Sequence, residues 1–226
     1  MNVTKDKISS VFFQYSIPAV LGMLAISSAN IVDGFFIGNY VGDFGLAAIN
    51  ISFPIFSLLF GFALMLAIGS SVVSGKLIGQ GDIKSASIIF SKTMVCITLF
   101  SFITCTGLFL NIETVLYLFG ADENLTKIAI EYLSVILIFI PFLMIGVVLD
   151  YFVRVDNRPN LAFIALLSSA LINVILDWFL IVYLQKGIFG AALATGISQL
   201  ALIFILLPHF FSKKATLKFV KPIGNY

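Results

Sequence analysis

Asp177 and Asn173 have side chains that could bind a cation or carry a proton inside a membrane. Asp177 lies within a run, residues 173–181, that is otherwise apolar apart from Asn173. The surrounding stretch, 161–183, is long enough for a helix to cross the roughly 30 Å hydrocarbon core of a bilayer. A carboxylate at the centre of such a helix costs about 2.5–3.5 kcal/mol, so it usually faces a bundle interior or a water-filled cavity. Asn173 lies one turn earlier on the same face. The pair predicts a small polar site; the alternative is an acid that only joins helices by hydrogen bonds.

A second carboxylate, Asp33, lies in another apolar stretch near the N-terminus. No lysine or arginine occupies the apolar stretch around either acid. Each carboxylate must therefore take up a proton or share a bound cation. Asn173, Thr195 and Tyr132 can supply neutral oxygens to a hard cation or hydrogen bonds to a protonated acid. The residue types thus predict a device that is coupled to a cation or to protons.

The elements that position these residues are predicted to be membrane-spanning helices. The 226 residues are 60% apolar and 11% charged, with a mean hydropathy of +1.12. This composition is typical of an all-α, polytopic membrane protein and excludes a soluble domain of this size. Turn residues separate the apolar stretches, and no linker-like segment interrupts them. We therefore expect one domain, a bundle of six transmembrane helices over residues 11–39, 46–74, 87–110, 126–151, 161–183 and 188–211.

The polar residues share one depth in the predicted bundle. At 1.5 Å per helical residue, Asp33, Asp177, Thr195 and Tyr132 each lie about 10 Å below the outer boundary. Asn50 is slightly shallower. We expect one polar layer in the outer half of the membrane, contributed by several helices.

Pro18 lies inside the first span, the same helix that carries Asp33. It removes a backbone hydrogen bond, so the helix can bend there. We expect a hinge that responds to the charge of Asp33; a fixed kink is the alternative.

Lysine and arginine predict the orientation. With the N-terminus in the cytoplasm, the inner segments hold eleven of these residues and the outer segments hold two, Lys127 and Lys186. The positive-inside rule therefore predicts that both termini are cytoplasmic. The eleven inner residues are Lys5, Lys7, Lys76, Lys84, Lys92, Arg154, Arg158, Lys213, Lys214, Lys218 and Lys221. The last four could bind anionic lipid, but a plain inner-face anchor is the preferred interpretation.

Other chemistries find little support in the sequence. The single histidine, His209, stands alone near the inner boundary, so no zinc cluster and no Ser/His catalytic set is predicted. Cys96 and Cys105 are nine residues apart on opposite faces of one helix and cannot pair. We expect no enzyme activity, no nucleic-acid partner and no cofactor beyond Na⁺ or H⁺ as the coupling ion.

The order and spacing of several short motifs resemble the multidrug and toxic compound extrusion (MATE) family. The resemblance covers nearly the whole chain and is strongest to prokaryotic members whose N-terminal lobe binds the coupling cation. Its marks are Ile17-Pro18-Ala19, Ile31-Val32-Asp33, Ile37-Gly38, Gly79-Gln80-Gly81-Asp82, Val153-Arg154-Val155-Asp156-Asn157-Arg158-Pro159, Asn173 with Leu176-Asp177, and Gly190-Ala191-Ala192-Leu193-Ala194-Thr195.

The resemblance implies a site and a role. It implies that Asp33, Asn173, Asp177 and Thr195 form a Na⁺ or H⁺ site, with Tyr132 beside it and Pro18 as the hinge. It further implies an antiporter that exports drugs or other organic, cationic or amphipathic compounds across a prokaryotic plasma membrane.

Family members have twelve helices in two lobes, so the sequence resembles one lobe, the N-terminal one. Alternating access needs two bundles that rock against each other. We therefore expect membrane lipid around the chain and, as partner, a second six-helix lobe or a second copy. Two other functions stay open: a lobe of a flippase for lipid-linked precursors, which a cationic cleft would favour, and an assembly subunit that does not transport.

Overall fold

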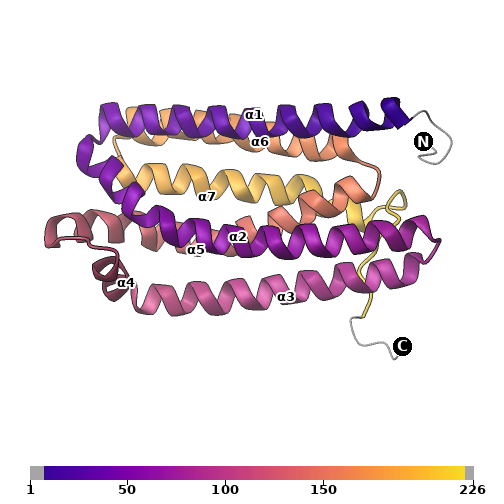
Figure 1. Cartoon of the computed structure of the whole chain (residues 1–226). Helices are drawn as coiled ribbons and strands as arrows, with labels where there is room; N and C mark the ends of the chain where they lie inside the picture. Colours follow the sequence, from indigo (N-terminus) through magenta and orange to yellow (C-terminus); the bar gives the residue numbers. More distant parts are fainter. Residues whose placement is uncertain (1–7, 222–226) are drawn as a thin grey trace.

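The computed structural model describes residues 8–221, and within them all regular structure is helical (Figure 1). The elements are α1 (Ile8–Tyr40), α2 (Asp43–Gly79), α3 (Ile83–Leu110), α4 (Ile112–Leu118), α5 (Glu123–Val155), α6 (Pro159–Asp177), the π-helix η1 (Trp178–Tyr183), α7 (Gly187–Leu206) and the 3₁₀-helix η2 (Leu207–Phe211). Six helical segments within this range are long and apolar enough to cross a membrane, with α6–η1 and α7–η2 each counting as one. The prediction of an all-α, six-span membrane bundle is confirmed.

The helices continue past the apolar limits that the sequence suggests. α2, for example, begins three residues before the predicted span and ends five residues after it. Backbone hydrogen bonding persists into the polar boundary, where side chains cap the ends. Asp82 accepts a hydrogen bond from the backbone N–H of Ser85 at 3.0 Å at the start of α3, and Asp122 does the same for Leu125 at 2.7 Å at the start of α5. Hydrogen bonds from the side chain and backbone of Ser85 lower the pKa of the Asp82 carboxyl.

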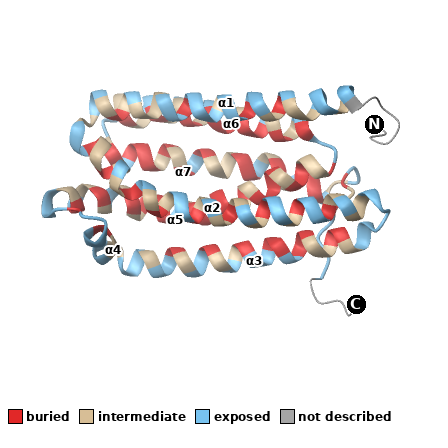
Figure 2. Cartoon of the chain, in the orientation of Figure 1, coloured by how far each residue is buried: buried red, intermediate tan, exposed pale blue. Residues whose placement is uncertain are grey.

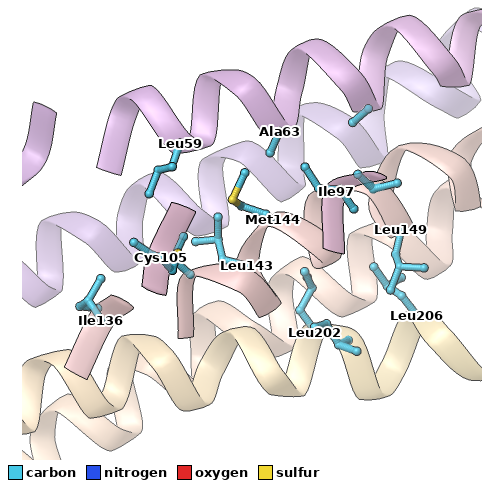
Figure 3. Close-up of a cluster of buried hydrophobic side chains, with 14 of the residues drawn as sticks. Leu59, Ala63, Ile97, Cys105, Ile136, Leu143, Met144, Leu149, Leu202 and Leu206 are labelled. Atoms are coloured by element: carbon cyan, nitrogen blue, oxygen red, sulfur yellow. The ribbon is translucent and has the colours of Figure 1, made fainter. Parts of the chain in front are cut away.

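α5 is the central helix of the bundle. In its most apolar window 61% of the residues are buried, against 17% in α1, and Figure 2 shows this contrast. α5 packs against α2, α3 and α7, and the side chains between them form the main core (Figure 3). That core includes Leu59 and Ala63 of α2, Ile97 and Cys105 of α3, Ile136, Leu143, Met144 and Leu149 of α5, and Leu202 and Leu206 of α7.

α1 and α2 diverge although they are neighbours in sequence. α1 packs mainly along α6, whereas α2 packs mainly along α5. The two pairs lie on different sides of α7 in Figure 1. A space therefore opens between α1 and α2 beyond the turn at Gly42, which joins them with a φ of 89°.

Small residues let α7 approach α5 closely. A Cβ atom at Gly196 would overlap the ring of Phe139, and one at Gly146 would lie 2.7 Å from Leu202. We expect Gly196→Ala to destabilise the bundle by about 1–3 kcal/mol, because the ring must shift out of a packed position. Unfolding in mixed micelles measures this. Gly107→Ala on α3, where nothing lies within 4 Å, is the control, and equal stability of the two variants would refute the packing argument.

The C-terminal strap, residues 212–221, crosses one end of the bundle as irregular chain that begins with a turn, and it is held by Asp156. The Asp156 side chain is buried between α5 and α6 and accepts hydrogen bonds from the backbone N–H groups of Thr216, at 3.0 Å, and Leu217, at 3.2 Å. His209 Nε2 lies 2.6 Å from Asp156 Oδ2. The expectation that His209 stands alone was therefore wrong: the sequence separates the two residues by 53 positions, and the fold joins them.

Candidate cation site

Asp177 lies where the sixth α-helix changes its winding. α6 ends at Asp177 and continues as the π-helix η1, in which Leu184 N–H bonds to Phe179 O, five residues earlier, at 2.9 Å. Tyr183 stacks on both Trp178 and Phe179 inside this segment. The predicted span over 161–183 is helical throughout, but its last part is wound as a π-helix, which hydrophobic patterning does not distinguish from an α-helix. Short π-helical segments within α-helices occur often at functional sites.

The carboxyl group of Asp177 is fully buried and lacks an ordinary partner. Its exposure is 0%, and neither of its oxygens has a hydrogen-bond partner among the described residues. Oδ1 of the half-buried Asp33 is likewise buried and unpaired. The two carboxyl groups are close enough to interact directly across the α1–α6 interface. Buried polar atoms in folded proteins are nearly always satisfied, so this geometry calls for a proton or an ion between them.

Asp33 also faces a cavity of about 330 Å³ in the space between α1 and α2. Tyr132 of α5 and Thr195 of α7 also line it, and Tyr132 is near enough to both carboxyl groups to feel their charge. The lining residues are Asn30, Asp33, Gly34, Leu46, Ile49, Asn50, Ser52, Phe53, Phe56, Tyr132, Leu133, Ile136 and Thr195. Four predicted residues, Asp33, Asn50, Tyr132 and Thr195, thus meet around one cavity.

Two other predicted site residues do not line that cavity. Asn173 is buried one turn before Asp177 on α6, and Asp177 is near Asp33 but is not among the residues that line the cavity. Pro18 is farther still, about four turns from Asp33. It is buried, and α1 runs through it as one continuous helix. The hinge therefore stays a prediction.

The other nine lining residues were not singled out from the sequence, and three of them bring an amide or aromatic rings to the cavity. Asn30 lies one turn before Asp33 on α1, and Phe53 and Phe56 bring aromatic surface from α2. The spacing of Asn30 and Asp33, three residues apart, places them on one helix face and was a usable signal. The two phenylalanines gave none, because 24 phenylalanines are spread along the chain.

The oxygen atoms around the cavity and at Asp177 favour a hard cation of low charge. Carboxylate, amide and hydroxyl oxygens suit a hard cation, whereas thiolate and imidazole ligands are absent from the cavity. Among the described residues no three His, Cys, Asp or Glu side chains come together. The arrangement can hold a proton shared by two carboxyls or a monovalent cation with neutral oxygens completing its shell.

Comparison with known proteins places the chain in one family. The family model MatE matches residues 18–179. Multidrug export protein MepA of Staphylococcus haemolyticus is 31% identical over 220 residues, which cover 93% of this chain and 47% of the relative. MepA of Staphylococcus saprophyticus is 28% identical over 222 residues, 95% of this chain and 49% of the relative. The chain therefore spans about half the length of the curated relatives it matches.

The fold agrees with solved structures. A crystal structure of MATE in complex with MaD3S superposes with a TM-score of 0.86 at 25% sequence identity. The match covers 91% of this chain and 46% of that one.

Proposed function

The chain belongs to the multidrug and toxic compound extrusion (MATE) family, and from that premise we propose that it forms the ion-binding lobe of a cation-coupled exporter. Members of this family are transporters and not enzymes. Because the chain corresponds to about half of its relatives, the proposed exporter includes a partner, either a second six-helix lobe or a second copy of this chain.

The proposed coupling site consists of Asp33, Asp177, Asn173 and Thr195, and it binds Na⁺ or H⁺. The observation that carries it is the pair of facing, buried carboxyl groups with oxygens that lack partners. Asp177 supplies the charge in the dry interior, and Asp33 supplies the charge that the cavity can reach. Asn173 and Thr195 provide neutral oxygens from α6 and α7, and the Tyr132 hydroxyl lies near the two acids as a further neutral group.

Ion occupancy would act on the α1–α6 contact. With the site empty, two like charges face each other in a medium of low dielectric and repel. A proton or cation removes that repulsion and draws Asp33 toward Asp177. Because Asp33 belongs to α1, the shift moves the helix that borders the cavity, and Pro18 gives α1 a point at which to bend. This two-state α1 is how the site would reshape the face that the partner lobe meets.

The cavity lining supports export of organic compounds that are cationic or amphipathic. Phe53, Phe56 and Tyr132 offer aromatic faces, which attract cations and apolar rings. No lysine or arginine is among the residues that line the cavity. A flippase for anionic, lipid-linked precursors would need such cationic groups, so the drug-type substrate is favoured.

In a prokaryotic plasma membrane, both ends of the chain would lie at the same end of the bundle, and that end would face the cytoplasm. The start of α1 and the strap lie at the same end of the bundle (Figure 1). Lys5 and Lys7, which contribute to the predicted orientation, lie outside the described residues. The lysines of the strap support the orientation from the described part.

Ion-dependent stability tests the proposed site in the chain itself. Thermal unfolding in detergent is measured at fixed pH with Na⁺ replacing K⁺ at constant ionic strength, and then across pH without Na⁺. We expect the unfolding temperature to rise with Na⁺ or with falling pH, because the ligand binds only the folded site. A profile that ignores both Na⁺ and pH would refute the coupling site.

A further inference from the structure

A second apolar groove lies between α3 and the strap, away from the ion site. Its volume is about 350 Å³, near the lower end of pockets that hold small ligands. Ser91, Met94, Val95, Thr98 and Leu99 of α3 line one wall, and Phe219 and Val220 of the strap line the other. Val95 and Leu99 are 45% and 59% exposed, so the groove opens to the outside of the bundle.

The strap is fixed against α3 in a definite register. The N–H of Lys218 donates to Ser87 Oγ at 3.4 Å, and the N–H of Val220 donates to Ser91 Oγ at 2.9 Å. Two residues of extended chain span about 6.6 Å, and four helical residues rise about 6 Å. The spacing from Lys218 to Val220 therefore matches the spacing from Ser87 to Ser91. The hydrogen bonds to Asp156 anchor the same strap from its other side. The groove is therefore preformed.

The hydroxyl groups in the groove are not available to a polar ligand as donors. Ser91 Oγ donates to Ser87 O at 2.9 Å, and Thr98 Oγ1 donates to Met94 O at 2.7 Å. What the groove offers to an occupant is consequently hydrocarbon surface. An acyl chain fits this chemistry, because it needs no hydrogen bonds.

The charges near the groove select an anionic head group. α3 and the strap together contain six lysines and no acidic residue. The nearest acids are the α3 cap, Asp82, and the buried strap anchor, Asp156, whose carboxyl accepts from the N–H groups of Thr216 and Leu217. Lys218 and Lys221 flank the two groove residues of the strap and are exposed. Lys92 already has an interaction within the chain, so a head group would be bound by the strap lysines. The six lysines are Lys84, Lys92, Lys213, Lys214, Lys218 and Lys221.

The depth of the groove fits a phospholipid of the leaflet on the strap side. α3 has 28 residues, about 42 Å, so each end extends about 6 Å beyond a 30 Å core. Ser87, which bonds to Lys218, then lies at the core boundary, where head groups begin. The wall from Ser91 to Leu99 lies about 6–18 Å deeper, among acyl chains.

We propose that this groove is a binding site for an anionic phospholipid, with one acyl chain between α3 and the strap and the head group beside Lys218 at the core boundary. Lys221 lies deeper, and its long side chain would extend toward the same head group. The clustered lysines alone favoured a plain anchor; the preformed apolar groove beneath them adds the lipid site. It is independent of the ion site.

Native mass spectrometry of the whole chain tests the lipid site. The chain is released from micelles that contain equal amounts of phosphatidylglycerol and phosphatidylcholine with the same acyl chains. Each lysine near an anionic head group contributes about a fivefold factor, so we expect about 30-fold preferential retention of one phosphatidylglycerol. Lys218→Gln with Lys221→Gln should remove that preference. Val95→Trp, which fills the groove, should remove the bound lipid itself.

Two matched controls separate the groove from general effects. Lys213→Gln with Lys214→Gln removes the same charge from the same strap, and Ile103→Trp adds the same ring to an exposed position farther along α3; both should retain the lipid. Equal retention of the two lipids by the native chain overturns the proposal. So does an equal loss in the 213/214 control, or a dimer that Val95→Trp dissociates, which would assign the groove to a second copy.

Discussion

Asp177→Asn should abolish the response of the folded chain to Na⁺ or to pH while leaving the bundle folded. If the native chain binds Na⁺, it gains about 2.7 kcal/mol when the ion is 100-fold above its Kd, and the variant should gain nothing. The amide keeps the size of the carboxyl but cannot balance a cation or exchange a proton. It also removes a charge that costs about 2.5–3.5 kcal/mol at such a depth, so the ion-free variant should be at least as stable as the native chain.

A matched control separates this effect from a general change in charge. Asp43→Asn makes the same substitution at an exposed position at the start of α2, and its unfolding should follow Na⁺ and pH as in the native chain. Asp33→Asn should lose the response as Asp177→Asn does, because the two carboxyls interact. An Asp177→Asn chain that still gains stability with the ion would reduce Asp177 to a structural acid.

The length of the apolar stretches and the depth of the polar residues within them were sufficient to predict the bundle and four residues of the cavity. Six apolar stretches gave the spans, and counting residues from their outer ends brought Asp33, Tyr132 and Thr195 to one level; in the structure all three line one cavity. Such arguments succeed because a helix in lipid must satisfy its own backbone, so residue number converts directly to depth.

The features that sequence did not reveal depend on contacts between distant segments or on details of winding. The shift from α6 to η1 leaves the hydrophobic pattern unchanged, so the position of Asp177 at that transition was invisible. The pairing of Asp156 with His209 depends on where α7 ends relative to the α5–α6 turn. From the sequence alone the strap looks like an ordinary polar tail. The hydrogen bonds that hold it to the bundle come from its backbone N–H groups, which carry no sequence signature.

Asp156→Ala should destabilise the bundle by about 3–5 kcal/mol and release the strap. The carboxyl is the acceptor for the N–H groups of Thr216 and Leu217 and for His209, and alanine would leave these buried or half-buried donors unsatisfied. Each such donor costs about 1–3 kcal/mol. Unfolding in mixed micelles measures the loss of stability.

Limited trypsin digestion reports the strap separately from global stability. Lys213, Lys214 and Lys218 are cleavage sites within it, and cleavage requires the chain to leave the surface of the bundle. We expect rapid cleavage in Asp156→Ala at temperatures where the bundle stays folded. His209→Ala keeps the Thr216 and Leu217 bonds to Asp156, so its strap should be cleaved more slowly than the strap of Asp156→Ala. Asp122→Ala, which removes a comparable cap at the opposite end of the bundle, should leave the strap as protected as in the native chain. If the Asp156→Ala strap is equally protected, then the serines of α3 hold it and Asp156 is dispensable.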